Sequence, residues 1–253
     1  MNFFEYKTVA ERYAKSRPYF HPLVTQKVKA HLGIQRTVNF AIDVGCGPGQ
    51  STVALKEIAD FVIGADISAE MLGFAEINSG IQYIQASAEG LPIQSRSSDL
   101  LISSLAFHWF NQERFLAEAR RVLKDKAWLI ISNNGFTGQM IENPTFEKWI
   151  IQVYERQYPS PPRNSAPMTA EIAQQHGFNF AHEESYQNEV LFTVEQLSAY
   201  LITQSNVIAA TEQGKERIED VYLWLNEEMK SFFPNENATF TFGGYIWYLQ
   251  KTL

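Results

Sequence analysis

Short apolar runs recur along the first half of the chain, and segments with helical spacing separate them. Runs of roughly four to eight apolar residues bounded by turn residues are typical of strands buried on both faces of a parallel sheet. The runs lie at residues 40–44, 61–65, 81–85, 99–104 and 127–131. Strands that alternate with helices in this way predict an α/β fold with a doubly wound sheet.

The intervening segments predict helices because their apolar residues recur on one face. Val24, Val28 and Leu32 form such a stripe before the first strand. The predicted helices are residues 8–16, 22–32, 50–59, 68–77, 114–123 and 169–176, with Gly177 as the stop of the last one. Two later stretches, 180–192 and 238–250, are strand-like and predict strands six and seven of the sheet.

Two segments exceed what a minimal sheet of this kind needs. Residues 135–167 contain several aromatic residues and a proline cluster, and residues 193–234 have the apolar spacing of helices. We expect these two cap insertions to pack together over a substrate, within a single domain that covers residues 1–253.

A glycine-rich turn, Gly45-Cys46-Gly47-Pro48-Gly49, follows the first strand and precedes a helix. Glycines let the backbone turn tightly and let a ligand approach without Cβ atoms in the way. A strand, a glycine loop and a helix in this order predict a cradle for a nucleotide-type cofactor. The loop lacks the lysine of a phosphate-binding loop, and its third glycine comes one residue too early for a dinucleotide fingerprint.

Asp66 ends the second predicted strand, 21 residues after Gly45. A carboxylate at this place can accept hydrogen bonds from both hydroxyls of a ribose. The alternative is that Asp66 caps the helix predicted at residues 68–77. Ser68 is the better N-cap, so we expect the Asp66 carboxylate to serve the ligand.

The amino-acid composition argues against several classes of ligand and binding partner. A net charge of −7 without a long basic run argues against nucleic acid. The single cysteine, Cys46, excludes an internal disulfide and a cysteine-based metal site, and no metal-ligand spacing occurs. The N-terminus lacks the apolar core of a signal peptide, and no apolar run approaches the ~20 residues of a membrane span. We therefore expect a cytoplasmic protein without membrane contact, as a monomer or homodimer.

Five sequence elements occur in a fixed order: D-x-G-x-G-x-G at residues 43–49, the acid Asp66, A-S-A-E-x-L-P at 86–92, D-L-L-I-S-S-x-A-x-H-W at 99–109 and R-V-L-K at 121–124. Together they resemble class I S-adenosyl-L-methionine (SAM)-dependent methyltransferases, in the small-molecule branch (methyltransferase type 11) that includes trans-aconitate methyltransferase. The resemblance covers roughly residues 10–132. It implies a seven-stranded, mostly parallel Rossmann-like sheet with an antiparallel seventh strand, helical cap insertions and SAM as cofactor.

The resemblance also implies the site residues. The cofactor-binding residues would be Arg17, Asp43, Gly45, Cys46, Gly47, Asp66, Ile67, Met71, Ser87, Ala88, Glu89 and Ser104. Arg17 belongs to a segment similar to the family's Y-x-x-x-R-P-x-Y. In the family this segment is part of a lid, so residues 1–38 would form lid helices over the cofactor. The alternative is that the segment is a surface loop with a buried aromatic anchor. Ser87 stands where the family has an aspartate that receives the adenine amino group. The Ser104 carbonyl would receive the SAM ammonium.

The expected reaction is in-line displacement at the sulfonium methyl of SAM, for which the protein mainly aligns and desolvates the reactants. The acceptor would be a small molecule methylated on oxygen or nitrogen, including the case of a carboxylate. A hydroxyl or amine acceptor needs a base, and His108 is the candidate catalytic residue; its alternative is a hydrogen-bonded interior histidine. Two other functions stay open: a non-catalytic SAM- or nucleoside-binding protein, and a nicotinamide-dependent oxidoreductase.

Overall fold

The computed structural model describes residues 7–162, 167–212 and 214–253. Parts of the predicted lid and of the first cap insertion, residues 1–6 and 163–166, lie outside this range. The chain divides into two compact units. The sheet unit comprises Tyr19–Asn133, Arg163–Ser185 and Tyr245–Leu253, and the aromatic unit comprises Met1–Pro18, Asn134–Pro162 and Tyr186–Gly244.

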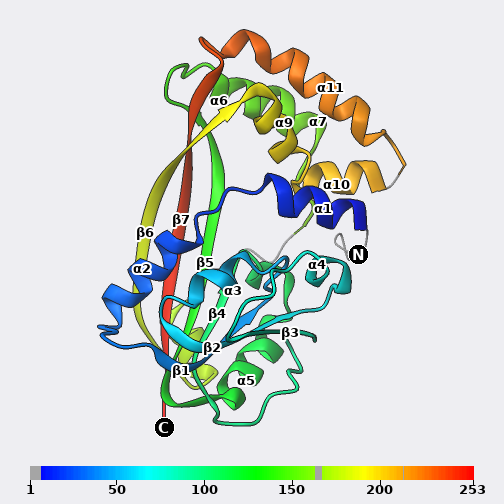
Figure 1. Ribbon diagram of the computed structural model, residues 1–253. Helices are drawn as coiled ribbons and strands as arrows, with labels where there is room; N and C mark the ends of the chain where they lie inside the picture. The colour runs from blue at the N-terminus through cyan, green and yellow to red at the C-terminus, as the bar shows by residue number, and fades with distance from the viewer. Residues whose placement is uncertain (1–6, 163–166, 213) are drawn as a thin grey trace. The chain divides into compact units, whose positions relative to one another are not determined.

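Seven strands form one sheet in the order β3-β2-β1-β4-β5-β7-β6 (Figure 1). They are β1 (Val38–Val44), β2 (Ala59–Asp66), β3 (Ile81–Gln85), β4 (Ser98–Ser104), β5 (Leu123–Met140), β6 (Phe178–Thr193) and β7 (Asn237–Lys251). The pairs β1–β2, β2–β3, β1–β4 and β4–β5 are parallel, and β7 is antiparallel. The predicted doubly wound sheet is confirmed, and its order reverses between β1 and β4, where such sheets bind ligands.

The helices are divided between the two units. Those of the sheet unit are α2 (His21–His31), α3 (Gln50–Leu55), α4 (Ala69–Leu72), the 3₁₀ turn η1 (Phe107–Trp109), α5 (Gln112–Val122) and α8 (Ala170–Gln175). Those of the aromatic unit are α1 (Lys7–Ser16), α6 (Phe146–Trp149), the π-helix η2 (Ile150–Tyr154), α7 (Glu155–Gln157), α9 (Val194–Leu201), α10 (Ser205–Glu212), α11 (Ile218–Met229) and η3 (Lys230–Phe232). In the described part of the chain, every helix is too short or too polar to cross a membrane.

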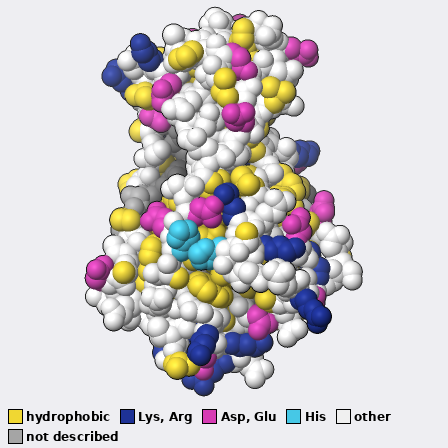
Figure 2. Space-filling view, turned by 90° about the vertical axis from the view of Figure 1, so that its left-hand side faces the viewer, with side chains coloured by type: hydrophobic (Ala, Val, Ile, Leu, Met, Phe, Trp, Pro, Cys, Tyr) yellow, Lys and Arg dark blue, Asp and Glu magenta, His cyan; other side chains and the backbone are white. Residues whose placement is uncertain are grey.

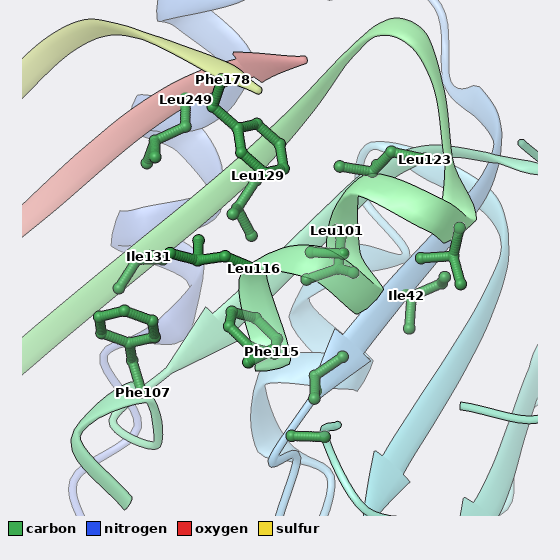
Figure 3. Close-up of a cluster of buried hydrophobic side chains, with 14 of the residues drawn as sticks. Ile42, Leu101, Phe107, Phe115, Leu116, Leu123, Leu129, Ile131, Phe178 and Leu249 are labelled. Atoms are coloured by element: carbon green, nitrogen blue, oxygen red, sulfur yellow. The ribbon is translucent and has the colours of Figure 1, made fainter. Parts of the chain in front are cut away.

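The main core of the sheet unit lies between one face of the sheet and α5. Figure 3 shows Leu101, Leu129 and Ile131 of the central strands packed against Phe115 and Leu116 of α5. Their side chains are almost completely buried. Burial of one such side chain contributes about 1.5–3 kcal/mol, so this apolar face holds the central strands in place.

Helix α2 is fixed at its far end to strands β5 and β6. The His31 ring lies edge-on to Trp128 at 6.2 Å and stacks on His182 at 4.8 Å. Beside them, Lys27 and Glu184 form a 2.5 Å ion pair. Figure 2 shows a group of histidine side chains bordered by acidic and basic side chains. These contacts hold the helix whose first residue is His21.

Three predicted elements differ clearly in length from the observed ones. The helix predicted at 68–77 is only α4, which ends at Leu72. The one predicted at 50–59 stops at Leu55, because Ala59 already pairs with Val38 as part of β2. The fifth strand is longer than its predicted five residues and starts at Leu123. Its start contains Lys126 at φ +64°, a backbone conformation that favours glycine.

The aromatic unit has a core of its own. The two segments predicted as cap insertions share one buried cluster, in which Trp149 and Tyr154 meet Leu197, Tyr200 and Leu225. Because aromatic side chains bury large areas, this cluster makes the two segments a single packed body. Its role as a cap over the substrate stays a prediction.

Candidate functional site

The glycine loop after β1 is tied to the end of β2 by its own backbone. The N–H groups of Gly45 and Cys46 both donate to the Ala65 carbonyl, at 2.8 and 3.1 Å. Gly45 has φ +73°, and a Cβ there would lie 2.4 Å from the Cβ of Ala106. Both the backbone conformation and the close approach therefore require glycine at this position.

Gly47 and Asp66 meet at the outer side of this loop. The Gly47 N–H donates to Asp66 Oδ2 at 2.8 Å, while Oδ1 accepts from the Ser68 N–H at 2.9 Å. Gly47 has φ +54°, and an added Cβ would meet no atom of the described residues within 4 Å. Burial raises the pKa of Asp66, against the effect of these backbone N–H groups. A carboxylate has about four acceptor sites, so Asp66 keeps capacity for a ligand beside an open loop.

Asp43, near the end of β1, is fully buried under α3. Its Oδ2 accepts hydrogen bonds of 2.6 Å from the hydroxyls of both Ser51 and Thr52. Oδ1 has no hydrogen-bond partner within the described part of the chain. Burial raises the pKa of Asp43 to about 6. An unpaired buried carboxylate oxygen is costly, so this atom suits a ligand that brings a donor or a positive charge.

The residues after Asp66 combine a helix cap with exposed apolar surface. The Ser68 hydroxyl accepts from the Met71 N–H at 3.1 Å, which confirms Ser68 as the N-cap of α4. Met71 is buried beneath this turn. Ile67, between the carboxylate and the cap, is 58% exposed. Because Ile67 is exposed next to the Asp66 carboxylate, its side chain offers an apolar surface on which the planar ring of a nucleotide base could pack.

The segment after β3 places three of the predicted residues together. The Ser87 hydroxyl donates to the Glu89 carboxylate, and the Glu89 N–H returns a 3.3 Å bond to the Ser87 oxygen. The other Glu89 oxygen accepts from the Asn111 N–H at 2.9 Å. Ala88 is buried in the sheet-unit core. Ser87 thus has a partner of its own, and its contact with adenine stays a prediction.

The end of β4 carries an unusual turn. Ser104 pairs with Ser132 of β5, and the next residue, Leu105, donates its N–H to the Ser132 carbonyl at 2.9 Å. Leu105 has φ +60°, a conformation that costs a non-glycine residue of order 1–3 kcal/mol and clusters at functional sites. His108 follows in η1, half-buried, with its ring 4.8 Å from that of Trp109. Both predicted residues, Ser104 and His108, thus belong to the same strand end and the turn after it.

His21, the first residue of α2, lies against this strand end. The sequence pattern gives it no role. Its Nδ1 lies 3.4 Å from the Ser104 hydroxyl, and the side chain is only 7% exposed. Burial lowers the pKa of His21 to about 3, so the ring is neutral at physiological pH. The one available signal was its place directly after the lid-like segment of residues 13–20.

Arg17 lies in the aromatic unit and is held there. Its guanidinium donates to the Thr203 carbonyl at 2.8 Å and lies over the rings of Tyr13 and Tyr200, at 4.5 and 5.1 Å. Its Nε is buried without a hydrogen-bond partner among the described residues. These contacts explain its position within its own unit. Its predicted contact with the cofactor stays a prediction.

The charges around the glycine loop favour a ligand that brings hydrogen-bond donors or a positive charge. Asp43 and Asp66 supply acceptors, while residues 39–55 contain no lysine or arginine. Among the described residues, no group of three or more histidine, cysteine, aspartate or glutamate side chains is arranged to hold a metal ion.

Residues 42–131 match the family model of the methyltransferase domain, Methyltransf_11. Over this range the chain is similar to a methyltransferase domain of this type. The matched range of the methyltransferase domain runs from β1 into β5 and contains the glycine loop, Asp66, Ser104 and His108. The predicted resemblance is thus confirmed over residues 42–131 of the sheet unit.

Known relatives agree with this family. A provisionally named methyltransferase of Dictyostelium discoideum is 30% identical over 162 residues, which cover 63% of this chain and 61% of the relative. The "Probable S-adenosylmethionine-dependent methyltransferase CRG1" of Saccharomyces cerevisiae is 34% identical over 121 residues, or 44% of this chain and 40% of the relative. The chain thus spans less than two thirds of the length of these relatives in the matched regions.

A solved structure resembles most of the chain in its fold. A provisional type II methyltransferase from Anaeromyxobacter dehalogenans superposes with a TM-score of 0.68 at 20% identity, covering 90% of this chain and 94% of that one. At this identity the likeness concerns the fold. It confirms the Rossmann-like architecture of class I methyltransferases for this sheet.

Proposed function

We propose that this protein is a SAM-dependent methyltransferase that methylates a small-molecule acceptor by direct in-line transfer. The observation that carries the proposal is the hydrogen bond from the Gly47 N–H to Asp66 at an open glycine loop, inside the matched methyltransferase domain. It supports the proposal because the Asp66 carboxylate, which could accept ribose hydroxyls, lies next to a loop whose outer side a ligand can approach.

The residues present fit SAM in their chemistry. Asp66 would accept the ribose hydroxyls through its remaining lone pairs, and Asp43 Oδ1 offers a buried acceptor to the positively charged amino-acid end. Ile67 supplies apolar surface on the adenine side. Ser104 and Leu105 end β4 in a strained turn, which supports the proposal that the Ser104 carbonyl receives the ammonium group.

SAM supplies, when bound, a sulfonium methyl that is already activated for attack. The task of the chain is then to hold the reactants in line and to keep water away from them. His108 is the residue proposed to take the acceptor proton when the acceptor is a hydroxyl or an amine. A carboxylate acceptor has no proton to lose, and His108 would then only donate a hydrogen bond.

The test is transfer of a labelled methyl group. The protein is incubated with methyl-labelled SAM and a panel of small carboxylates, alcohols and amines, and the label in the small-molecule fraction is measured. We expect label on one class of acceptor, and none with the Gly47→Val variant. Saturable SAM binding without label on any acceptor would instead favour the non-catalytic binding protein. A thermal shift with NAD but not with SAM would favour the oxidoreductase.

A further inference from the structure

His21 and Ser104 form a buried polar pair at the end of β4. His21 is the first residue of α2, and its ring packs on that of Phe20 at 4.3 Å. Its Nδ1 lies 3.4 Å from the Ser104 hydroxyl oxygen. Since a serine hydroxyl both donates and accepts, either tautomer of the neutral ring can share this hydrogen bond.

The pair lies on the face of the sheet that carries Asp43. In a parallel sheet, paired residues point to the same side, and so do residues two apart along a strand. Asp43 pairs with Ile102, two residues before Ser104, and Ser104 pairs with Ser132. Asp43, Ser104 and Ser132 therefore share one face, at the carboxyl ends of three neighbouring strands.

Two of these three side chains have a buried oxygen atom without a protein partner among the described residues. The Ser132 hydroxyl and Asp43 Oδ1 are buried and make no hydrogen bond within the described part of the chain. Ser104 differs from them because His21 satisfies its hydroxyl. Without the imidazole, the Ser104 hydroxyl would be a further buried group free to rotate, directly before the strained Leu105 turn.

We propose that His21 is a positioning residue that fixes the Ser104 hydroxyl, and with it the Leu105 turn, so that the end of β4 is preformed for the amino-acid part of SAM. The inference rests on the proposed function and adds to it a residue outside the glycine loop. It requires α2 to hold the ring in place, which the Lys27–Glu184 ion pair and the His31 contacts do from the other end of the helix.

The experiment is a double-mutant cycle on SAM affinity, measured by calorimetry. The variants are His21→Leu, Ser104→Ala and the double variant, with circular dichroism as the check on folding. We expect each single variant to weaken SAM binding about tenfold, the size of one buried hydrogen bond. The double variant should bind no more weakly than the weaker single one, because both changes remove the same interaction.

Two further variants separate positioning from general damage. His21→Asn keeps a polar side-chain group close to the place of Nδ1, and we expect it to recover most of the SAM affinity. His31→Asn removes ring contacts of α2 without touching Ser104. Because the Lys27–Glu184 ion pair still fixes that end of the helix, we expect the SAM affinity to stay unchanged. An equal loss in His31→Asn would show that a loosened α2, not the His21–Ser104 pair, causes the effect and would overturn the inference.

The same variants are also compared in their thermal stability without ligand. The two substitutions could be non-additive in the free energy of unfolding but additive in the free energy of SAM binding. That result would make the His21–Ser104 pair purely structural and would overturn the inference. Unchanged affinity in folded His21→Leu, or strictly additive losses, would do the same while the proposed function stands. A wild-type protein that does not bind SAM at all would instead refute the proposed function, and coupling in unfolding would then assign the pair to stability alone.

Discussion

The backbone N–H of Gly47 donates a 2.8 Å hydrogen bond to Oδ2 of Asp66, which joins the glycine loop to the carboxylate that ends β2. The two strands that lead to these residues are paired in parallel up to Val44 and Ala65. The loop and the carboxylate therefore leave the sheet side by side. A ligand that uses the loop must also meet Asp66.

Loss of the Asp66 carboxylate should weaken SAM binding. Asp66→Ala removes the acceptor for the ribose and frees the Gly47 N–H, so we expect a loss of about 1.5–3 kcal/mol in binding free energy. The matched control is Asp60→Ala on the same strand, which removes an exposed carboxylate hydrogen-bonded to Thr37. Calorimetry on both folded variants makes the comparison. Unchanged affinity in Asp66→Ala would remove Asp66 from the site.

SAM affinity should fall in mild acid because of Asp43. The pKa of this buried carboxyl is raised to about 6, and a bound positive charge favours its ionised form. Binding must then release a proton once the pH is below about 6, so the affinity decreases as the pH falls through this value. We expect Asp43→Asn to bind more weakly at pH 8 but with a flatter pH dependence. Parallel pH profiles for the two proteins would contradict this role of Asp43.

His21 should make the fold sensitive to acid. Its pKa is about 3 in the folded protein but about 6.5 in an unfolded chain, so the unfolded state binds the proton first as the pH falls. The contribution of His21 to the free energy of unfolding is therefore fully present above about pH 6.5. Below this pH it decreases by about 1.4 kcal/mol per pH unit, down to about pH 3.

The measurement for His21 is a comparison of unfolding. Denaturant unfolding of wild type and His21→Asn between pH 7 and pH 4 isolates this effect, because the opposing titration of Asp43 is common to both proteins. We expect the difference in unfolding free energy to shift steadily in favour of His21→Asn as the pH falls. A difference that does not depend on pH would mean that the ring titrates normally in the folded protein.

The role of His108 depends on the acceptor. With a hydroxyl or amine acceptor, His108→Gln should lower kcat by about 10²–10⁴-fold, the usual contribution of a general base. With a carboxylate acceptor, the loss should stay below about tenfold, since no proton is transferred. The measurement is the transfer rate of labelled methyl groups to the acceptor found in the panel. A large loss with a carboxylate acceptor would contradict the proposed division of roles.

Strands β1 to β4 were predictable because each is a short, largely apolar run between turn residues. Strand β3 starts and ends where the pattern places it, and β4 is only one residue longer. The Ser68 cap was also readable, since a serine before a helix has a local cause. The helix after it was predicted too long, because α4 stops at Leu72, earlier than the apolar pattern indicates.

The glycine loop and Asp66 were predictable from spacing, because a tight turn and a strand end leave local signals. The partner of Ser104 was not. His21 is 83 residues away in the chain, and only the packing of α2 on the sheet brings the two together. The Leu105 turn was equally hidden, because leucine carries no preference for a positive φ. Long-range pairs and tertiary strain leave no pattern in a single sequence.

The central claim is that the open side of the loop at Gly47 is where SAM binds. Gly47 and Gly33 both have positive φ, +54° and +61°, and an added Cβ meets no described atom within 4 Å at either position. A valine therefore brings similar backbone strain to both, but only the one at Gly47 would obstruct the proposed ligand.

The deciding measurement is a calorimetric titration of wild type, Gly47→Val and Gly33→Val with SAM. We predict saturable one-to-one binding by wild type, similar binding by Gly33→Val and at least a hundredfold weaker binding by Gly47→Val, with the folded content of all three compared by circular dichroism. Equal SAM affinity in the two folded glycine variants, or no SAM binding by wild type, would contradict the account.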